Sequence, residues 1–136
     1  MNYFITGIST VVGKSVVSAI VTEALEADYW KPVQAGDLDR SDSHKVTDLI
    51  SNPTTIVHKN SYALNTPMSP HAAAAIDNIE IRLADIVRPK TDNHLVIEGA
   101  GGLLVPLNDT DTILDLIHPS EKVIDVSRHY LGGINH

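Results

Sequence analysis

The chain has 136 residues, enough for one domain with one hydrophobic core. It contains no cysteine, which excludes disulfides, thiolate chemistry and zinc sites built on cysteine. Its formal net charge of −7 argues against a surface that binds nucleic acid through phosphates. No run of about 18 apolar residues is present, and Met1-Asn2-Tyr3-Phe4 lacks the basic start of a signal peptide. We therefore expect a cytoplasmic protein without a membrane span.

The first part of the chain predicts strands alternating with helices. Residues 2–6 are aromatic and β-branched, which indicates a buried strand, and a glycine loop follows. Apolar residues recur at helical spacing from residue 14 to about residue 27. Residues 29–34 predict a short strand whose end carries Lys31, and a helix is expected over residues 43–51.

The middle of the chain has a weaker pattern. Residues 65–70 predict a loop with two prolines, and the segment 55–64 is compatible with a strand. A helix is expected to begin near Pro70, with Ser69 as its N-cap. A further amphipathic helix is expected over residues 79–87.

The last part predicts a buried strand at residues 94–98, which a glycine-rich turn ends at once. A short capped helix is expected at 111–117 and another strand at 122–127. The alternation predicts a single α/β domain, residues 1–136, with a mostly parallel sheet flanked by helices. Ligands of such a sheet bind beyond the carboxyl ends of the strands, where this chain carries its glycine-rich and polar loops.

The segment between the first strand and the first helix has the composition of a phosphate-binding loop. Gly13-Lys14-Ser15 supplies backbone N–H groups, a cation and a hydroxyl, with which such loops bind phosphates and Mg²⁺. The standard pattern has one residue fewer between its glycines than the chain has between Gly7 and Gly13. The alternative interpretation is an N-capped helix with an exposed lysine.

Other residues are candidates for the same site. Glu98, at the tip of a buried strand, is costly to bury unpaired, and a metal ion would remove that cost. A salt bridge at a tight turn is the alternative. Lys31 at a strand end and Asp42 in the following loop could both point at the phosphates and the metal. A surface lysine and a helix-capping aspartate are the commoner explanations.

A more specific pattern comes from five stretches in this order: TGISTVVGKS, YWKPVQAG, TPMSPHAAA, VIEGAGGLLVPL and SRHYLGGINH. Together they closely resemble dethiobiotin synthetase, the ATP-dependent carboxylase of biotin synthesis, from Phe4 to His136. The wider glycine spacing is that family's own form of the phosphate loop. The resemblance implies a P-loop NTPase-like fold and a homodimer without nucleic-acid or membrane partners.

The resemblance also implies an ATP- and Mg²⁺-dependent cyclo-ligase. Diaminopelargonic acid (7,8-diaminononanoate) and CO2 would form a carbamate, whose oxygen attacks the γ-phosphate of ATP. The second amine would then displace phosphate and close the ring of dethiobiotin, leaving ADP and phosphate. Because charge builds on the transferred phosphoryl group, positioning and electrostatic stabilisation should dominate the catalysis.

Roles for individual residues follow from the same resemblance. The catalytic residues would be Lys14, on the phosphates, and Lys31, on the carbamate. The nucleotide would be bound by Val12, Gly13, Lys14, Ser15 and Val16. Mg²⁺, which prefers oxygen ligands, would be bound by Ser15, Asp42 and Glu98, with Asp37 and Asp39 as alternatives to Asp42. The substrate would be bound by Lys31, Gln34, Ser69, Gly99, Ala100, Gly101, Gly102, Gly132 and Asn135.

The chain departs from the family at three positions: Val11 replaces a polar or acidic residue, Ala35 stands where serine or threonine is common, and Asp125 interrupts an apolar strand. Family members also continue beyond the last matching motif to their adenine-binding residues. We therefore expect the chain to be the N-terminal portion of a longer domain. Two other functions stay open: a P-loop ATPase switch of the partition or septum-placement type, and a non-catalytic remnant of the fold.

Overall fold

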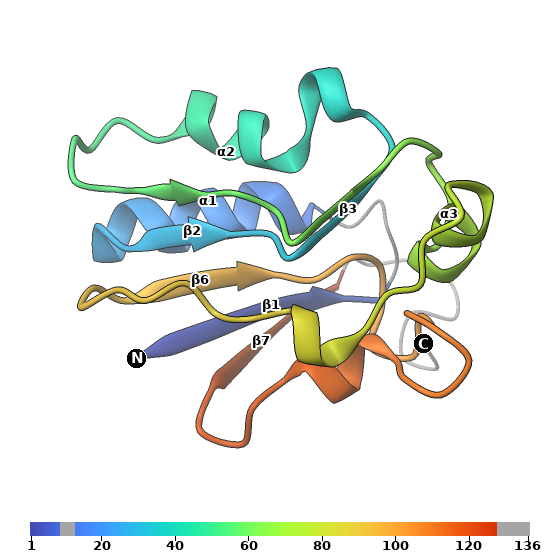
Figure 1. Cartoon of the computed structure of the whole chain (residues 1–136). Helices are drawn as coiled ribbons and strands as arrows, with labels where there is room; N and C mark the ends of the chain where they lie inside the picture. The colour runs from blue at the N-terminus through green and yellow to red at the C-terminus, as the bar shows by residue number, and fades with distance from the viewer. Residues whose placement is uncertain (9–12, 128–136) are drawn as a thin grey trace.

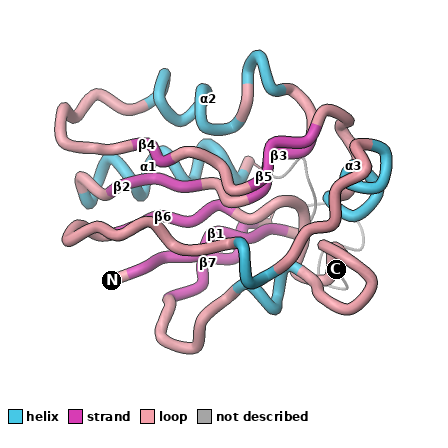
Figure 2. The backbone as a smooth tube through the Cα atoms, in the orientation of Figure 1, coloured by secondary structure: helices cyan, strands magenta, loops and turns pink. Residues whose placement is uncertain are grey.

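A computed structural model describes residues 1–8 and 13–127 of the chain. Its centre is a parallel five-stranded sheet with the order β4-β2-β6-β1-β7 (Figure 1). The strands in chain order are β1 (Asn2–Gly7), β2 (Asp28–Trp30), β4 (Val57–His58), β6 (Leu95–Glu98) and β7 (Lys122–Val126). Two further strands form a small parallel sheet beside it, β3 (Val33–Ala35) and β5 (Tyr62–Leu64) (Figure 2). The mostly parallel α/β architecture expected from the sequence is confirmed.

The helices lie in two places relative to this sheet. Helices α1 (Lys14–Leu25) and α2 (Asp42–Leu49) cover one face, whereas α3 (Pro70–Ile76) lies beyond the carboxyl ends of the strands (Figure 1). Single 3₁₀ turns are found at Leu38–Arg40, Leu83–Asp85 and Ile113–Leu116. In the part of the chain that the structure describes, no helix has the length and apolar character needed to cross a bilayer.

The position of β6 explains how distant residues meet. It is inserted between β1 and β2, so its last residue, Glu98, pairs in register with Ile5, while Ile97 pairs with Trp30. Side chains alternate between the faces along a strand, and Val96 and Glu98 therefore share the face covered by α1. The carboxyl end of β6 thus carries Glu98 between β1 and the residue after β2, Lys31.

Each face of the sheet has its own apolar core. The core beneath α1 and α2 consists of the buried residues Ile5, Ala19, Ala27, Tyr29, Val46, Val96 and Val126. The core on the opposite face is larger and includes Phe4, Trp30, Leu64, Ile81, Leu95, Ile97, Leu107 and Ile113. Because both faces of the central strands are buried, most of their residues are apolar, as is typical of parallel sheets. Thr6, Asp28 and Glu98 are buried polar exceptions.

A carboxylate ties α1 to the chain after α2. Glu23 accepts hydrogen bonds from the backbone N–H groups of Ser51 at 2.8 Å and Asn52 at 2.9 Å. It also accepts from the Ser51 hydroxyl and the Asn52 amide, both at 2.6 Å. These four bonds lower the pKa of Glu23 from 4.5 to about 2.

The helix predicted over residues 79–87 is wrong, because only the turn Leu83–Asp85 forms there. Ile79, Ile81 and Leu83 are spaced by two, which suits an extended chain as well as a helix. Ile81 is fully buried, whereas Ile79 is 39% exposed. The segment therefore reaches the core through single side chains rather than through a helical face.

Other elements differ in their bounds. The strand predicted over residues 29–34 is two strands, because the chain leaves the large sheet at Lys31-Pro32 and enters the small one. There the carbonyl of Pro32 accepts bonds from the N–H groups of Ser61 and Tyr62. The predicted helix at 111–117 is a 3₁₀ turn with a capping box at Thr112. Asp125 is solvent-exposed on β7, so it does not interrupt a buried surface.

Candidate functional site

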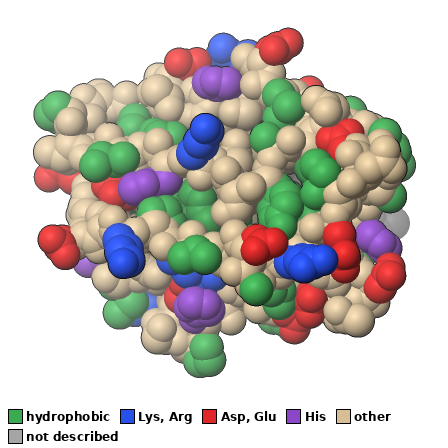
Figure 3. Space-filling model, in the orientation of Figure 1, with side chains coloured by type: hydrophobic (Ala, Val, Ile, Leu, Met, Phe, Trp, Pro, Cys, Tyr) green, Lys and Arg blue, Asp and Glu red, His purple; other side chains and the backbone are tan. Residues whose placement is uncertain are grey.

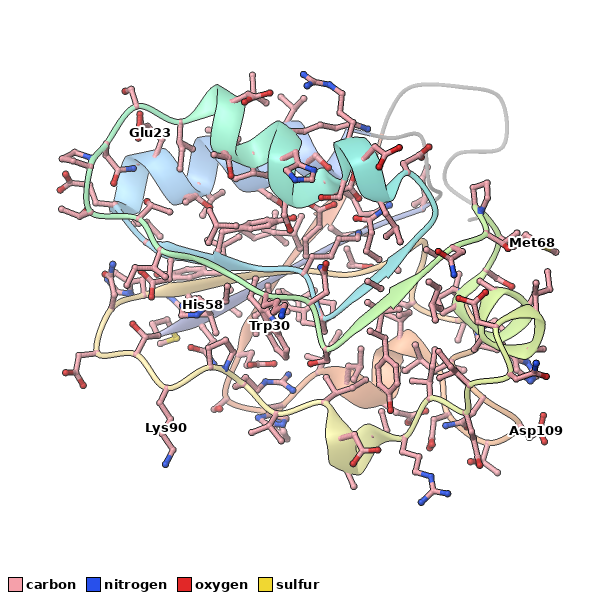
Figure 4. The ribbon with its side chains drawn as sticks, turned by 45° about the horizontal axis from the view of Figure 1, so that its top comes forward. Glu23, Trp30, His58, Met68, Lys90 and Asp109 are labelled. Atoms are coloured by element: carbon pink, nitrogen blue, oxygen red, sulfur yellow. The ribbon has the colours of Figure 1, made fainter. Side chains whose placement is uncertain are left out.

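A pocket of about 770 Å³ opens at the carboxyl ends of β2 and β6, beside the amino end of α1. Its wall is formed by Gly13, Lys14, Ser15, Val16, Lys31, Gln34, Ala35, Asp37, Asp42, Lys45, Pro67, Met68, Ser69, Pro70, Glu98, Ala100, Gly101 and Val105. Met68, on one rim, lies at the opposite end of the molecule from Glu23 and His58 (Figure 4). The site is therefore where an open parallel sheet normally binds its ligand.

The amino end of α1 forms one side of the pocket. Gly13 precedes the helix with φ of 86°, a left-handed conformation that favours glycine. The first N–H groups of a helix have no partner within it and attract anions. Lys14, 5% exposed, is beside them. Burial and the nearby Lys31 lower the pKa of Lys14, while Glu98 and Asp42 partly offset this effect. Val11 and Val12 lie outside the described residues.

Lys31 lies between two carboxylates. Its ammonium is 2.9 Å from Oδ2 of Asp42 and 3.3 Å from Oε2 of Glu98, and it donates to the carbonyl of Gly99 at 3.0 Å. Burial alone would lower the pKa of Lys31, but Glu98 and Asp42 outweigh it, so that pKa is raised. Burial alone would raise the pKa of Asp42, but Lys31, together with Glu98 and Lys45, outweighs it, so that pKa is lowered. Both groups are thus held in their charged forms.

Glu98 has partners from two other elements. The hydroxyl of Ser15, on α1, donates to its Oε2 at 3.0 Å, and the hydroxyl of Tyr29, on β2, donates to its Oε1 at 3.0 Å. Burial and then the charge of Glu98 raise the pKa of Tyr29 well above its usual value. Sequence reasoning missed Tyr29. The available signal was its polar tip in a buried strand two residues before Lys31.

Asp42 is positioned by the start of α2. Ser41 caps the helix and shares a capping box with His44, which fixes the first turn. Gln34 accepts a bond from the N–H of Asp42 at 3.1 Å and donates to the carbonyl of Gly36 at 3.0 Å. Gln34 therefore uses its amide to hold the backbone next to Asp42.

The two alternatives to Asp42 lie farther along the wall. Asp37 borders the main pocket, whereas Asp39 borders an adjoining pocket of about 670 Å³. Of the three aspartates, Asp42 is the one paired with Lys31. The structure thus places Asp42, rather than Asp39, beside Glu98.

The residues expected to bind the substrate are only partly brought together. Ser69, Ala100 and Gly101 line the pocket, and Ser69 takes the N-cap position of α3 without a side-chain cap bond. The N–H group of Gly99 is not available to a substrate, because it donates to the carbonyl of Ile5 at 2.9 Å. Gly102 packs against the carbonyl of Gly7 rather than lining the pocket. Gly132 and Asn135 lie outside the described residues.

The oxygen atoms in the pocket suit a hard cation. Ser15, Asp42 and Glu98 offer one hydroxyl and two carboxylates, the kind of ligands that Mg²⁺ takes alongside water and phosphate oxygens. The ammonium of Lys31 lies between both carboxylates and forms an ion pair with each. No group of three or more His, Cys, Asp or Glu side chains suited to a metal is found among residues 1–8 and 13–127. Phosphates would have to supply part of the coordination.

A parallel sheet with Gly-Lys-Ser at the amino end of the helix that follows its first strand, and with carboxylates in the same pocket, defines a P-loop nucleotide-binding domain. The chain belongs to the family described as AAA domain, whose model matches residues 1–136. Within that class it is similar to ATP-dependent dethiobiotin synthetases, which confirms the resemblance found in the sequence.

Three of these relatives show the extent of the similarity. The protein of Christiangramia forsetii is 66% identical over 135 residues, which cover 99% of this chain and 65% of the relative. The protein of Cytophaga hutchinsonii is 57% identical over 99% of this chain and 66% of its own length. The protein of Chlamydia pneumoniae is 47% identical over 97% of this chain and 59% of its own length. The chain thus spans slightly less than two thirds of the relatives' length.

Proposed function

We propose that the chain carries the phosphate and diamine sites of a dethiobiotin synthetase. In this reaction 7,8-diaminononanoate and CO2 form a carbamate, ATP phosphorylates it, and the second amine closes the ring to dethiobiotin with release of ADP and phosphate. The observation that carries the proposal is the position of Lys31. Its ammonium lies in one pocket with the phosphate-loop residues Lys14 and Ser15 and with two carboxylates.

Each group has a role that its chemistry supports. Lys14 and the first N–H groups of α1 bind the β- and γ-phosphates. Ser15, Asp42 and Glu98 hold Mg²⁺, which neutralises phosphate charge when bound. Lys31 stabilises the carbamate and the charge that develops on the transferred phosphoryl group. As a buried ammonium close to the reacting atoms, it acts with little screening by water.

The diamine would lie along the wall made by Ser69, Ala100 and Gly101, next to Gln34. The resemblance assigns its carboxylate to Gly132 and Asn135 at a homodimer interface, and a cytoplasmic homodimer is part of the proposal. On the face seen in Figure 3, lysine and arginine side chains are scattered rather than gathered into one patch.

The test is product formation from Mg-ATP, bicarbonate and 7,8-diaminononanoate, detected as dethiobiotin by mass spectrometry. Because the relatives are longer, two proteins are assayed: the chain alone, and the chain fused to the part of the Christiangramia forsetii protein that it does not cover. Dethiobiotin from the joined protein, lost on substitution of Lys31, supports the proposal. No product from the joined protein rejects it, and ATP hydrolysis stimulated by a protein instead of the diamine favours the switch.

A further inference from the structure

The ammonium of Lys31 lies between two carboxylates, those of Asp42 and Glu98. It is 2.9 Å from Asp42 Oδ2 and 3.3 Å from Glu98 Oε2, and its side chain is only 4% exposed. These two carboxylates are the ones that the proposed function gives to Mg²⁺, so the inference rests on that function. A metal ion bound by both carboxylates would lie next to a buried positive charge.

The hydrogen bonds of Glu98 strengthen this competition. Its Oε2 accepts from Ser15 and from Lys31, and its Oε1 accepts from Tyr29. The oxygen that faces Asp42 therefore already has two donors, which matches its lone pairs. A metal ion can gain this oxygen only if Lys31 withdraws.

Withdrawal without a new partner is costly, because it leaves a buried ammonium with one carbonyl, that of Gly99, at 3.0 Å. Phosphate groups are such a partner. The pocket places Lys31 in the same wall as Lys14 and the amino end of α1, where phosphates would bind. A metal–nucleotide complex brings both the replacement cation for the carboxylates and the replacement anion for Lys31.

We propose that Lys31 acts as a built-in cation that keeps Asp42 and Glu98 closed to free divalent metal. The phosphates of an incoming metal–nucleotide complex draw its ammonium off the carboxylates while the metal takes its place. The nucleotide and the metal therefore enter as one complex, and the metal does not bind first. The same movement brings Lys31 to the phosphoryl group that it stabilises.

Lys45 provides the matched control. It also pairs with Asp42, but through Oδ1 at 3.7 Å, and its side chain is 48% exposed. Among the described residues, Lys45 forms no hydrogen bond or ion pair with Glu98, and water screens its charge. Replacing Lys45 removes a positive charge near the same aspartate without emptying the space between the two carboxylates.

The test is Mn²⁺ binding without nucleotide, measured by electron paramagnetic resonance of the free ion, for the unmodified chain, Lys31→Met and Lys45→Met. We expect Lys31→Met to bind Mn²⁺ about tenfold or more tightly than the unmodified chain, because it frees two buried carboxylates. Lys45→Met should change the affinity by less than about threefold. An affinity of Lys31→Met no higher than that of the unmodified chain would overturn the inference.

Thermal stability with and without Mn²⁺ is a second measurement, and it remains informative if Lys31→Met folds poorly. Lys31→Met leaves buried carboxylates uncompensated, so its melting temperature in EDTA should be lower, and Mn²⁺ should raise it again. If the variant is unfolded in EDTA, Mn²⁺ should restore its circular dichroism. If Mn²⁺ changes neither the melting temperature nor the circular dichroism of Lys31→Met, the proposal is contradicted.

The two proposals can fail separately. If the joined protein makes dethiobiotin but Lys31→Met binds Mn²⁺ no more tightly, the proposal that Lys31 excludes free metal is rejected and the proposed function stands. If Lys31→Met binds Mn²⁺ more tightly but the joined protein makes no dethiobiotin, the proposal for Lys31 stands and the proposed function is rejected.

Discussion

The hydroxyl of Tyr29 donates to Oε1 of Glu98 at 3.0 Å from within the core beneath α1. A fully buried tyrosine thus holds the carboxylate that faces the phosphate loop. The other oxygen of Glu98 remains directed at Ser15 and Lys31. Tyr29 acts on the site through Glu98 and is a positioning residue.

Tyr29→Phe should lower the free energy of unfolding by about 1–3 kcal/mol, because one oxygen of a buried carboxylate loses its donor. Tyr62→Phe is the matched control, since the Tyr62 hydroxyl donates to an exposed partner, Asp85, at 3.3 Å. It should cost less than about 1 kcal/mol. Urea unfolding followed by circular dichroism measures both, and equal losses would argue against the role given to Tyr29.

Under the proposed function, Lys14→Ala should weaken ATP binding by about tenfold or more, because it would remove a charge-assisted bond to the phosphates. Binding is followed by titration with a fluorescent ATP analogue. Lys90→Ala is the control, since Lys90 lies on the surface away from the pocket (Figure 4) and should leave the affinity unchanged. A Lys14→Ala chain with unaltered affinity would remove this lysine from the nucleotide site.

Glu23→Gln should make the chain less stable in a pH-dependent way. The pKa of Glu23 is about 2 in the folded chain and near 4.5 without these hydrogen bonds. Its stabilising contribution is therefore complete above about pH 4.5 and is lost as the pH falls toward 2.

The difference in unfolding free energy between the chain and Glu23→Gln should be largest at neutral pH and shrink below pH 4.5. Glu80→Gln is the control, because the side chain of Glu80 is 71% exposed and its ion pair with Arg82, at 3.6 Å, is open to solvent. A Glu23→Gln difference that is constant from pH 7 to the acid limit would contradict the role of the carboxylate charge.

Gly36→Ala should destabilise the chain more than Gly13→Ala. Both glycines have positive φ, 77° and 86°, which costs an alanine about 1–2 kcal/mol. A Cβ at Gly36 would also lie 2.5 Å from the Cα of Pro67, whereas one at Gly13 would have no atom of the described residues within 4 Å. Urea unfolding should show an additional loss of about 1–3 kcal/mol for Gly36→Ala, and equal losses would show that the Pro67 loop can move away.

The sequence predicted most of the sheet, because β1 and β6 are short apolar runs that end in glycine loops. It did not predict that Lys31-Pro32 divides one apparent strand between two sheets, since this depends on bonds from Ser61 and Tyr62 far along the chain. For the site, their places at strand ends and in the following loop made Lys31, Asp42 and Glu98 candidates, and the resemblance gave them roles. Tyr29 could not be found in that way, because its role appears only when β2 and β6 are neighbours.

Strand β6 occupies the middle of the five-stranded sheet, with β2 on one side and β1 on the other. Its amides should therefore exchange with deuterium more slowly than those of β4 and β7, each at an end of the described sheet. Glu98 stands at the end of this protected strand, whereas Lys31 follows β2 and Asp42 begins a helix. On heating, Glu98 should accordingly keep its native position longer than Lys31 and Asp42.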